Sequence, residues 1–232
     1  MGLLACHTGE PALEQASVQQ EPALQRRSVG EVPERGDAVL EPGEFHEYEL
    51  GHLASAEGVH LVLEQQGVDL VAQVVGEDDA ILLSVDLPIG AFGFEHVCFA
   101  AREAGHYRLR VGPWSAEDSG PYQIRRRDQS VPSQHDPPED PEAAERIAHC
   151  EAGLRALVEA EAHQDRASPA VAELYGEAIT RWRRVGADFP LAVALKQAGW
   201  HSFQRGRLET AVARFEEALA LLRHVSEESI QT

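Results

Sequence analysis

The stretch VHLVLEQQGVDLVAQVV, residues 59–75, decides the fold class of the first half of the chain. Every second residue from Val59 to Leu63 is apolar, which is the period of a strand with one buried face. Gly67 then marks a tight corner, and a second apolar run follows it. The pattern predicts two strands joined by a short turn, with Asp69 capping the corner by accepting hydrogen bonds from backbone amides.

Similar periods of two residues extend outward from this stretch, over about residues 35–127. The further candidate strands are FHEYEL (45–50), AILLSVD (80–86), HVCFAAR (96–102), HYRLRV (106–111) and PYQIRR (121–126). Glycine and proline turn signals separate them at short intervals. No segment between them is long enough for a helical crossover, so an antiparallel β-sandwich is predicted over 35–127.

The apolar period changes to 3.6 residues after the proline-rich segment DQSVPSQHDPPED (128–140), which predicts a semi-rigid linker. Capping and proline signals predict helices that begin at Pro141, Pro169 and Phe189, and an apolar stripe predicts a fourth from about Leu208. The predicted fold is therefore multidomain β plus α, with α-helical hairpins over 141–232. Residues 1–34 are polar and aperiodic, and they are expected to form a disordered N-terminal tether.

The stretch ALKQAGWHSFQRGRLETAVARFEEALALLR (194–223) resembles a tetratricopeptide repeat. Gly199, Ala211, Phe215 and Ala218 stand where that family's pattern has glycine, alanine, an aromatic residue and alanine. Small residues let two helices approach closely, and the aromatic ring fills the gap between hairpins. A degenerate earlier copy carries Val171, Tyr175 and Ala178. The resemblance implies a concave helical face that binds a protein segment.

The first half looks like the pre-peptidase C-terminal type of β-sandwich. The likeness rests on LEPGEFHEYEL (40–50), EQQGVDLVAQV (64–74), SVDLPIG (84–90), FGFEHVCFAAREAGHYRLRV (92–111) and GPYQI (120–124). The order of sandwich, linker and hairpins resembles the N-terminal region of bacterial tetratricopeptide proteins that end in a caspase-like CHAT domain. It implies an alternative function, as the regulatory N-terminal part of a CHAT-type peptidase whose catalytic domain is absent from this sequence.

The charge balance bears on the class of partner. The chain has 20 basic and 39 acidic residues, for a net charge of −19. So negative a surface repels phosphate backbones, and nucleic acid is excluded as a partner. No apolar stretch is long enough for a transmembrane helix.

The first residues bear on the compartment. LLAC (3–6) resembles a bacterial lipobox, in which Cys6 would carry a lipid anchor. If an export signal has been lost before it, a periplasmic or cell-envelope lipoprotein is expected; otherwise the chain is expected in the cytoplasm.

No motif of a nucleophilic or zinc-dependent enzyme is present, so the chain is expected to have no catalytic residues and no cofactor. Cys98 and Cys150 match no metal-binding spacing, and the total of three cysteines is odd. Both are therefore predicted to be small, buried, unpaired side chains.

The sandwich itself offers two alternative ligand classes. A calcium site would need the carboxylates of Asp69, Asp86 and Glu95 to converge at one end. Binding of carbohydrate would depend on exposed aromatic rings, for which the candidates are Phe92, Phe94 and Trp114. Nothing in the spacing of the three carboxylates forces them together.

The preferred hypothesis is a non-enzymatic adaptor that binds a protein or peptide segment in a groove of the helices. In the repeat register, Trp200 faces that groove as an aromatic anchor. The neighbouring groove positions are Val193, Lys196, Gln197, Phe203 and Gln204. The acidic surface favours basic or neutral partners.

Overall fold

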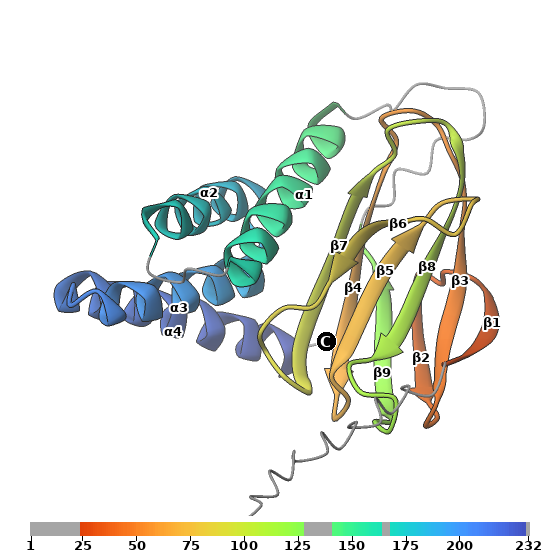
Figure 1. The fold of residues 1–232 in the computed structure, drawn as a ribbon, viewed down its shortest axis with the longest axis horizontal. Coiled ribbons are helices and arrows are strands. Elements are labelled where there is room, and N and C mark those ends of the chain that lie inside the picture. Colours follow the sequence, from red (N-terminus) through yellow and green to blue (C-terminus); the bar gives the residue numbers. More distant parts are fainter. Residues whose placement is uncertain (1–23, 128–140, 164–167, 231–232) are drawn as a thin grey trace, which may run out of the picture.

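The computed structural model describes residues 24–127, 141–163 and 168–230, and it is a β plus α protein (Figure 1). The strands are β1 (Gln25–Glu31), β2 (Arg35–Leu40), β3 (Glu44–Leu53), β4 (Gly58–Gln66), β5 (Leu70–Val75), β6 (Ile81–Val85), β7 (Phe92–Ala100), β8 (Gly105–Pro113) and β9 (Gly120–Arg126). The helices are α1 (Pro141–Ala162), α2 (Pro169–Val185), α3 (Asp188–Gln204) and α4 (Leu208–Ile230). Cys6 and the predicted linker 128–140 lie outside the described residues.

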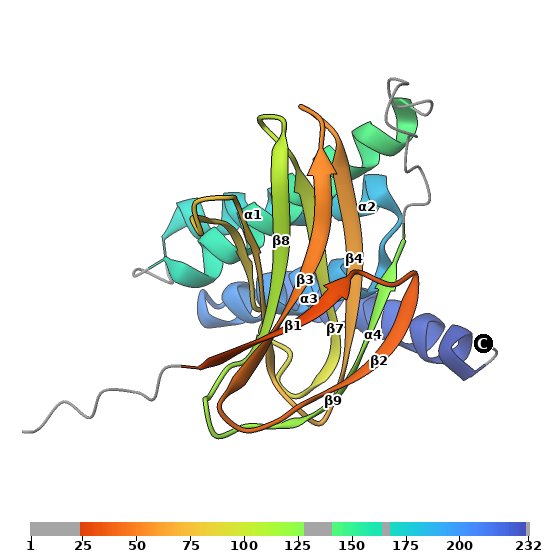
Figure 2. The ribbon, with the colours of Figure 1, turned by 90° about the vertical axis from the view of Figure 1, so that its right-hand side faces the viewer.

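The strands form two sheets that pack face to face (Figure 2). One has the order β1-β3-β8-β5-β6 and the other the order β2-β9-β4-β7. Of the pairings within the described ranges, only that of β1 with β3 is parallel. Tyr48 of β3 and Tyr122 of β9 meet between the sheets, with their hydroxyl oxygens 2.6 Å apart. Tyr107, Leu109 and Val111 of β8 are buried, as their alternation predicts.

β1 corrects the predicted N-terminal tether, because it lies within residues 1–34 and yet belongs to a sheet. All seven of its residues are exposed, so its sequence has no alternation that would reveal a strand. Parallel backbone pairing with β3 holds it instead, together with ion pairs of Arg26 with Glu47 and of Arg27 with Glu44. The formation of β1 therefore depends on backbone pairing with the edge of β3.

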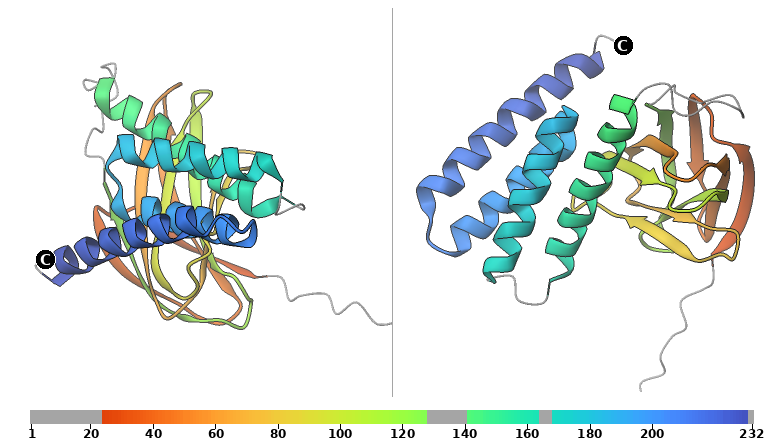
Figure 3. Two further views of the ribbon diagram at one scale, coloured as in Figure 1. Left: turned by 90° about the vertical axis from the view of Figure 1, so that its left-hand side faces the viewer. Right: turned by 90° about the horizontal axis from the view of Figure 1, so that it is seen from above.

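The four helices follow one another as packed antiparallel neighbours (Figure 3). Ser168 caps α2 by accepting a hydrogen bond from the N–H of Ala170 at 3.3 Å, and Gly186 ends that helix with a φ of 69°. A β-carbon on Gly199 of α3 would lie 2.7 Å from the ring of Phe215 on α4. Each predicted helix start lies within one residue of the observed one.

α1 packs against the outer face of the four-stranded sheet, on β4 and β7 (Figure 3). Ile147 lies so close to Gly58 that a β-carbon on the glycine would come within 2.7 Å of it. The N–H of Ala100 donates a hydrogen bond to the carboxylate of Glu151 at 2.9 Å. The buried apolar residues of the sandwich and of the helices therefore form one continuous core.

Cys98 of β7 and Cys150 of α1 form a disulfide across this contact, with their α-carbons 5.6 Å apart. Both are fully buried, but the prediction that they are unpaired is wrong. They lie 52 residues apart on a strand and a helix, so their pairing depends on how α1 docks on the sheet. Cysteine spacing carries no information about that docking.

Candidate functional site

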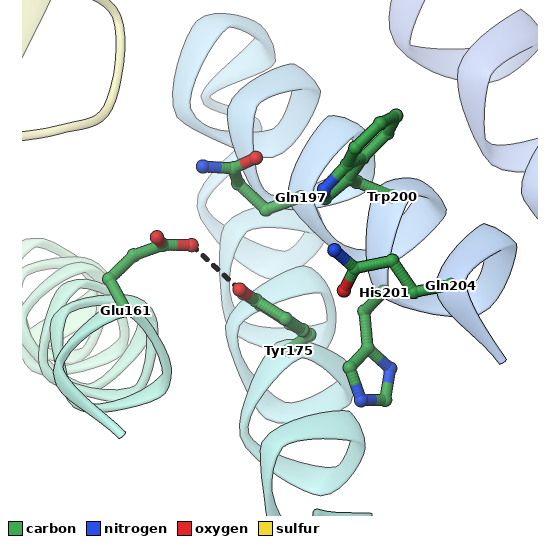
Figure 4. Close-up of a pocket in the computed structure, with 6 residues that line it drawn as sticks. All are labelled: Glu161, Tyr175, Gln197, Trp200, His201 and Gln204. Carbon is green, nitrogen blue, oxygen red and sulfur yellow. Dashed lines mark hydrogen bonds between the residues drawn. The ribbon is translucent and has the colours of Figure 1, made fainter. Parts of the chain in front are cut away.

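The first three helices surround a pocket of about 290 Å³, which we call the α3 groove. It is lined by Glu161, Tyr175, Gln197, Trp200, His201 and Gln204 (Figure 4). Four of these six residues come from α3, at spacings of three and four positions that put them on one face of that helix. Glu161 comes from α1 and Tyr175 from α2. The groove therefore requires the packing of three helices.

A hydrogen bond between two helices builds one wall of the groove. The hydroxyl of Tyr175 donates to the carboxylate of Glu161 at 2.6 Å (Figure 4). Because the acceptor is a carboxylate, this bond belongs to the stronger class of hydrogen bonds in proteins. It holds a negative charge at the groove and fixes the end of α1 against α2.

Two aromatic side chains lie at the groove on α3. Trp200 is 54% exposed and Phe203 is 49% exposed. Their rings stack with centroids 5.4 Å apart and an angle of 23° between the planes. Stacked aromatic rings that remain exposed present a large, rigid apolar surface, which is the usual anchor of a binding interface.

His201 lies deeper, at only 5% exposure. Burial lowers its pKa, and the positive charge of Arg205 lowers it further, so the imidazole is neutral at pH 7. Its ring meets that of Tyr175 edge to face, with centroids 6.0 Å apart. Within the described parts of the chain, its Nε2 atom has no hydrogen-bond partner. A ligand or water at the groove can satisfy that buried atom.

The structure brings together three of the six residues predicted to bind a partner, namely Gln197, Trp200 and Gln204. Phe203 does not line the pocket but stacks on Trp200. Val193, at 4% exposure, belongs to the core of the helices instead.

Lys196 also departs from the prediction. Its Nζ donates to the backbone oxygen of Pro88 at 2.9 Å, so this lysine contacts the sandwich. The prediction missed Glu161, Tyr175 and His201. His201 could have been found from its spacing of four residues from Gln197, whereas the other two require knowledge of how α1 and α2 pack.

The candidate calcium ligands lie close enough to influence one another. Burial raises the pKa of Asp69, Asp86 and Glu95, and repulsion among these carboxylates raises the pKa of Asp86 and Glu95 further. At the corner where capping by Asp69 was predicted, Gln65 accepts the hydrogen bond from the N–H of Leu70 at 2.5 Å. Asp69 instead keeps a buried oxygen, Oδ1, without a partner among the residues that the structure describes.

The three aromatic candidates for carbohydrate binding differ in their accessibility. Phe92 is 72% exposed and Trp114 is 66% exposed. Phe94 packs edge to face against Phe189 of α3, with centroids 5.0 Å apart. It therefore belongs to the contact between the sandwich and the helices.

One further cluster has the composition of a metal site. Donor atoms of His60, Cys98 and Cys150 all lie within 4.8 Å of one another.

Among the helices described here, none has the length and apolar character needed to cross a bilayer.

No protein-family model and no curated protein matches the chain. Among solved structures, it is similar to the pre-peptidase C-terminal domain of a collagenase from Bacillus anthracis, with 16% identity, a TM-score of 0.33, and coverage of 47% of this chain and 100% of that one. It is also similar to PliG from Aeromonas hydrophila, a periplasmic inhibitor of g-type lysozyme, with 14% identity, a TM-score of 0.32, and coverage of 44% and 96%. Neither likeness assigns the chain to a family.

Proposed function

We propose that this protein is a non-catalytic adaptor whose helices bind a segment of another protein in the α3 groove. The observation that carries the proposal is the stacked pair of Trp200 and Phe203, which stays exposed beside a pocket lined by polar groups. Exposed aromatic anchors next to hydrogen-bonding groups are the usual composition of a peptide-binding surface.

The groove also constrains the chemistry of the segment. An apolar or aromatic side chain would pack on Trp200, while Gln197 and Gln204 are suited to hydrogen bonds with its backbone. Glu161 adds a negative charge, and the chain as a whole carries −19. A segment with lysine or arginine beside its apolar anchor is therefore the favoured ligand.

The packing of the last two helices supports a tetratricopeptide-like arrangement. Gly199 and Phe215 hold glycine and aromatic positions of that repeat pattern, and a β-carbon on Gly199 would lie 2.7 Å from the Phe215 ring. This close approach explains on steric grounds why a glycine occupies position 199. In such repeats, the first helix of each hairpin faces the binding groove, which agrees with the position of Trp200.

The test uses peptides selected from a random displayed library against the full chain. Dissociation constants of selected peptides would be measured calorimetrically with the unmodified protein and with Trp200→Ala. Loss of an anchor worth about 2 kcal/mol weakens binding roughly 30-fold. Glu161→Gln should weaken peptides that carry lysine or arginine more than neutral ones.

Leu219→Ala is the matched control, because Leu219 is 54% exposed on α4 and does not line the groove. It should leave the dissociation constants unchanged. Peptides that bind Trp200→Ala as tightly as the unmodified chain would overturn the proposal. So would a library that yields no binding peptide.

A further inference from the structure

A second cluster of reactive side chains lies where α1 meets the four-stranded sheet. His60 on β4 stands directly opposite Cys98 on β7 in the antiparallel register. Cys150 reaches the same point from α1 and is bonded to Cys98. One donor atom of each residue lies within 4.8 Å of the other two, and both cysteines are fully buried.

His96 completes the cluster. It lies two residues before Cys98 on β7, and its Nδ1 is 3.1 Å from the Nε2 of His60. Only 6% of it is exposed, and its ring meets Trp182 edge to face with centroids 6.1 Å apart. A fixed partner on one ring nitrogen is what orients the histidine ligands of metal sites and sets their tautomer.

We propose that Cys98, Cys150 and His60 form a redox-controlled site for a thiophilic divalent cation, with zinc as the reference ion. In the oxidised chain the two sulfurs form the disulfide. A dithiol reductant gives the disulfide two electrons and two protons, becomes a disulfide itself, and leaves two thiols. Binding of the ion then releases both thiol protons, and the two thiolates balance the charge of the ion.

The geometry of the cluster suits such an ion. Zinc binds sulfur at about 2.3 Å and nitrogen at about 2.0–2.1 Å in a tetrahedron, which puts its two sulfurs roughly 3.8 Å apart. The donor atoms of the cluster lie within 4.8 Å of one another, which is compatible with that separation. His60 would supply one ring nitrogen to the ion, and its Nε2 lies 3.1 Å from Nδ1 of His96. Thiolate ligands select zinc over calcium or magnesium.

A disulfide alone does not explain the neighbouring histidines. A covalent S–S bond needs no imidazole, yet His60 stands opposite Cys98 and a nearly buried His96 orients it. A metal site uses both, because His60 supplies the third ligand and His96 fixes its ring. The ion would then join α1 to the sheet under reducing conditions, where the disulfide cannot.

The test is a titration of the full chain with cobalt(II), after reduction by a phosphine and under exclusion of oxygen. The reduced protein should bind one cobalt ion per chain, with a sulfur-to-cobalt charge-transfer band in the near ultraviolet and the visible bands of tetrahedral cobalt. Zinc should displace the cobalt. The oxidised protein should show none of these bands. A reduced protein that shows no bands, whether folded or unfolded, overturns the proposal.

Variants assign the ligands. Cys150→Ser should abolish the sulfur-to-cobalt band. His60→Ala retains the disulfide, so its folding can be checked in the oxidised state. It should weaken cobalt binding at least about tenfold. Cys6→Ser removes the third cysteine and should leave binding unchanged. Full binding in both His60→Ala and Cys150→Ser, or its loss in Cys6→Ser, would overturn the assignment.

Discussion

Glu95 is a buried carboxyl whose environment disfavours its charged form. It is fully buried on β7, and both of its carboxylate oxygens lie near the N–H of Leu87, at 3.0 and 3.1 Å. Gln65 donates a longer bond at 3.4 Å. Burial raises the pKa of Glu95 well above its usual value, and repulsion by Asp86 and Asp69 raises it further. Folding therefore favours the protonated acid.

This shift predicts how stability depends on pH. The pKa of Glu95 is higher in the folded than in the unfolded chain. The stability that this group contributes to the folded state is therefore fully present below about pH 4.5, and it is lost as pH rises through the folded pKa. The free energy of unfolding should fall with a slope of up to about 1.4 kcal/mol per pH unit. Glu95→Gln should remove that slope when urea unfolding is measured in EDTA between about pH 5 and pH 8.

The comparison isolates one carboxyl group. Asp69 and Asp86 also have raised pKa values, and they add slopes of the same sign to both proteins. Glu31→Gln, which replaces an exposed carboxyl on β1, should leave the profile unchanged. Parallel profiles for Glu95→Gln and the unmodified chain would show that the buried carboxyl is ionised in the folded state.

How much of the groove the sequence could predict depends on where each residue lies. Trp200, Gln197 and Gln204 follow from the period of a single helix, because spacings of three and four residues share one face. Glu161 and Tyr175 come from other helices, and no local pattern encodes the hydrogen bond that joins them. The period of α3 therefore predicted three of its groove residues, but it also gave Val193 and Lys196, which pack elsewhere, and residues that meet only through packing were not predictable.

Among the elements, the hairpin of α3 and α4 offers the sharpest test. Gly199→Ala would put a methyl group 2.7 Å from the Phe215 ring. Overpacking costs roughly 1–3 kcal/mol, whereas alanine in a helix gains about 1 kcal/mol over glycine. The net expectation is a loss of about 1 kcal/mol in the free energy of unfolding, measured in urea. With Phe215→Leu as the background, the same change should become stabilising.

Gly176→Ala in α2 is the matched control, since the added β-carbon has no described atom within 4 Å apart from its chain neighbours and the backbone of its own helix. It should stabilise the protein by about 0.5–1 kcal/mol. Equal effects of the two substitutions would mean that the Phe215 ring moves aside without cost, and that the glycine is not required for the packing of this hairpin.

The elements also differ in how well the sequence predicts them. The start of α2 could be predicted because a cap acts through its own neighbours, as Ser168 does toward Ala170. β1 could not, because its exposed residues take their conformation from the edge of β3. The docking of α1, and with it the pairing of Cys98 with Cys150, likewise depends on surfaces distant in sequence.

For the whole molecule, the question is how firmly the helices are attached to the sandwich. α1 is held by the disulfide and by the hydrogen bond from Ala100 to Glu151. α3 makes a separate contact, in which Phe189 meets Phe94 and lies against Gly93. Two contacts on different helices fix the orientation of the α3 groove relative to the sheets, which a single contact would leave free to pivot.

Phe189→Ala should loosen the second contact and leave the first intact. Loss of the aromatic pair removes about 1.4 kcal/mol, so amides of α3 and α4 should exchange hydrogen roughly tenfold faster, whereas those of α1 and β8 keep their rates. Hydrogen exchange followed by mass spectrometry measures this in the oxidised chain. Leu208→Ala, at a residue 57% exposed on α4, should change none of these rates. A uniform acceleration across strands and helices would instead mean that the two parts open only together, because the continuous core couples them more strongly than either contact does alone.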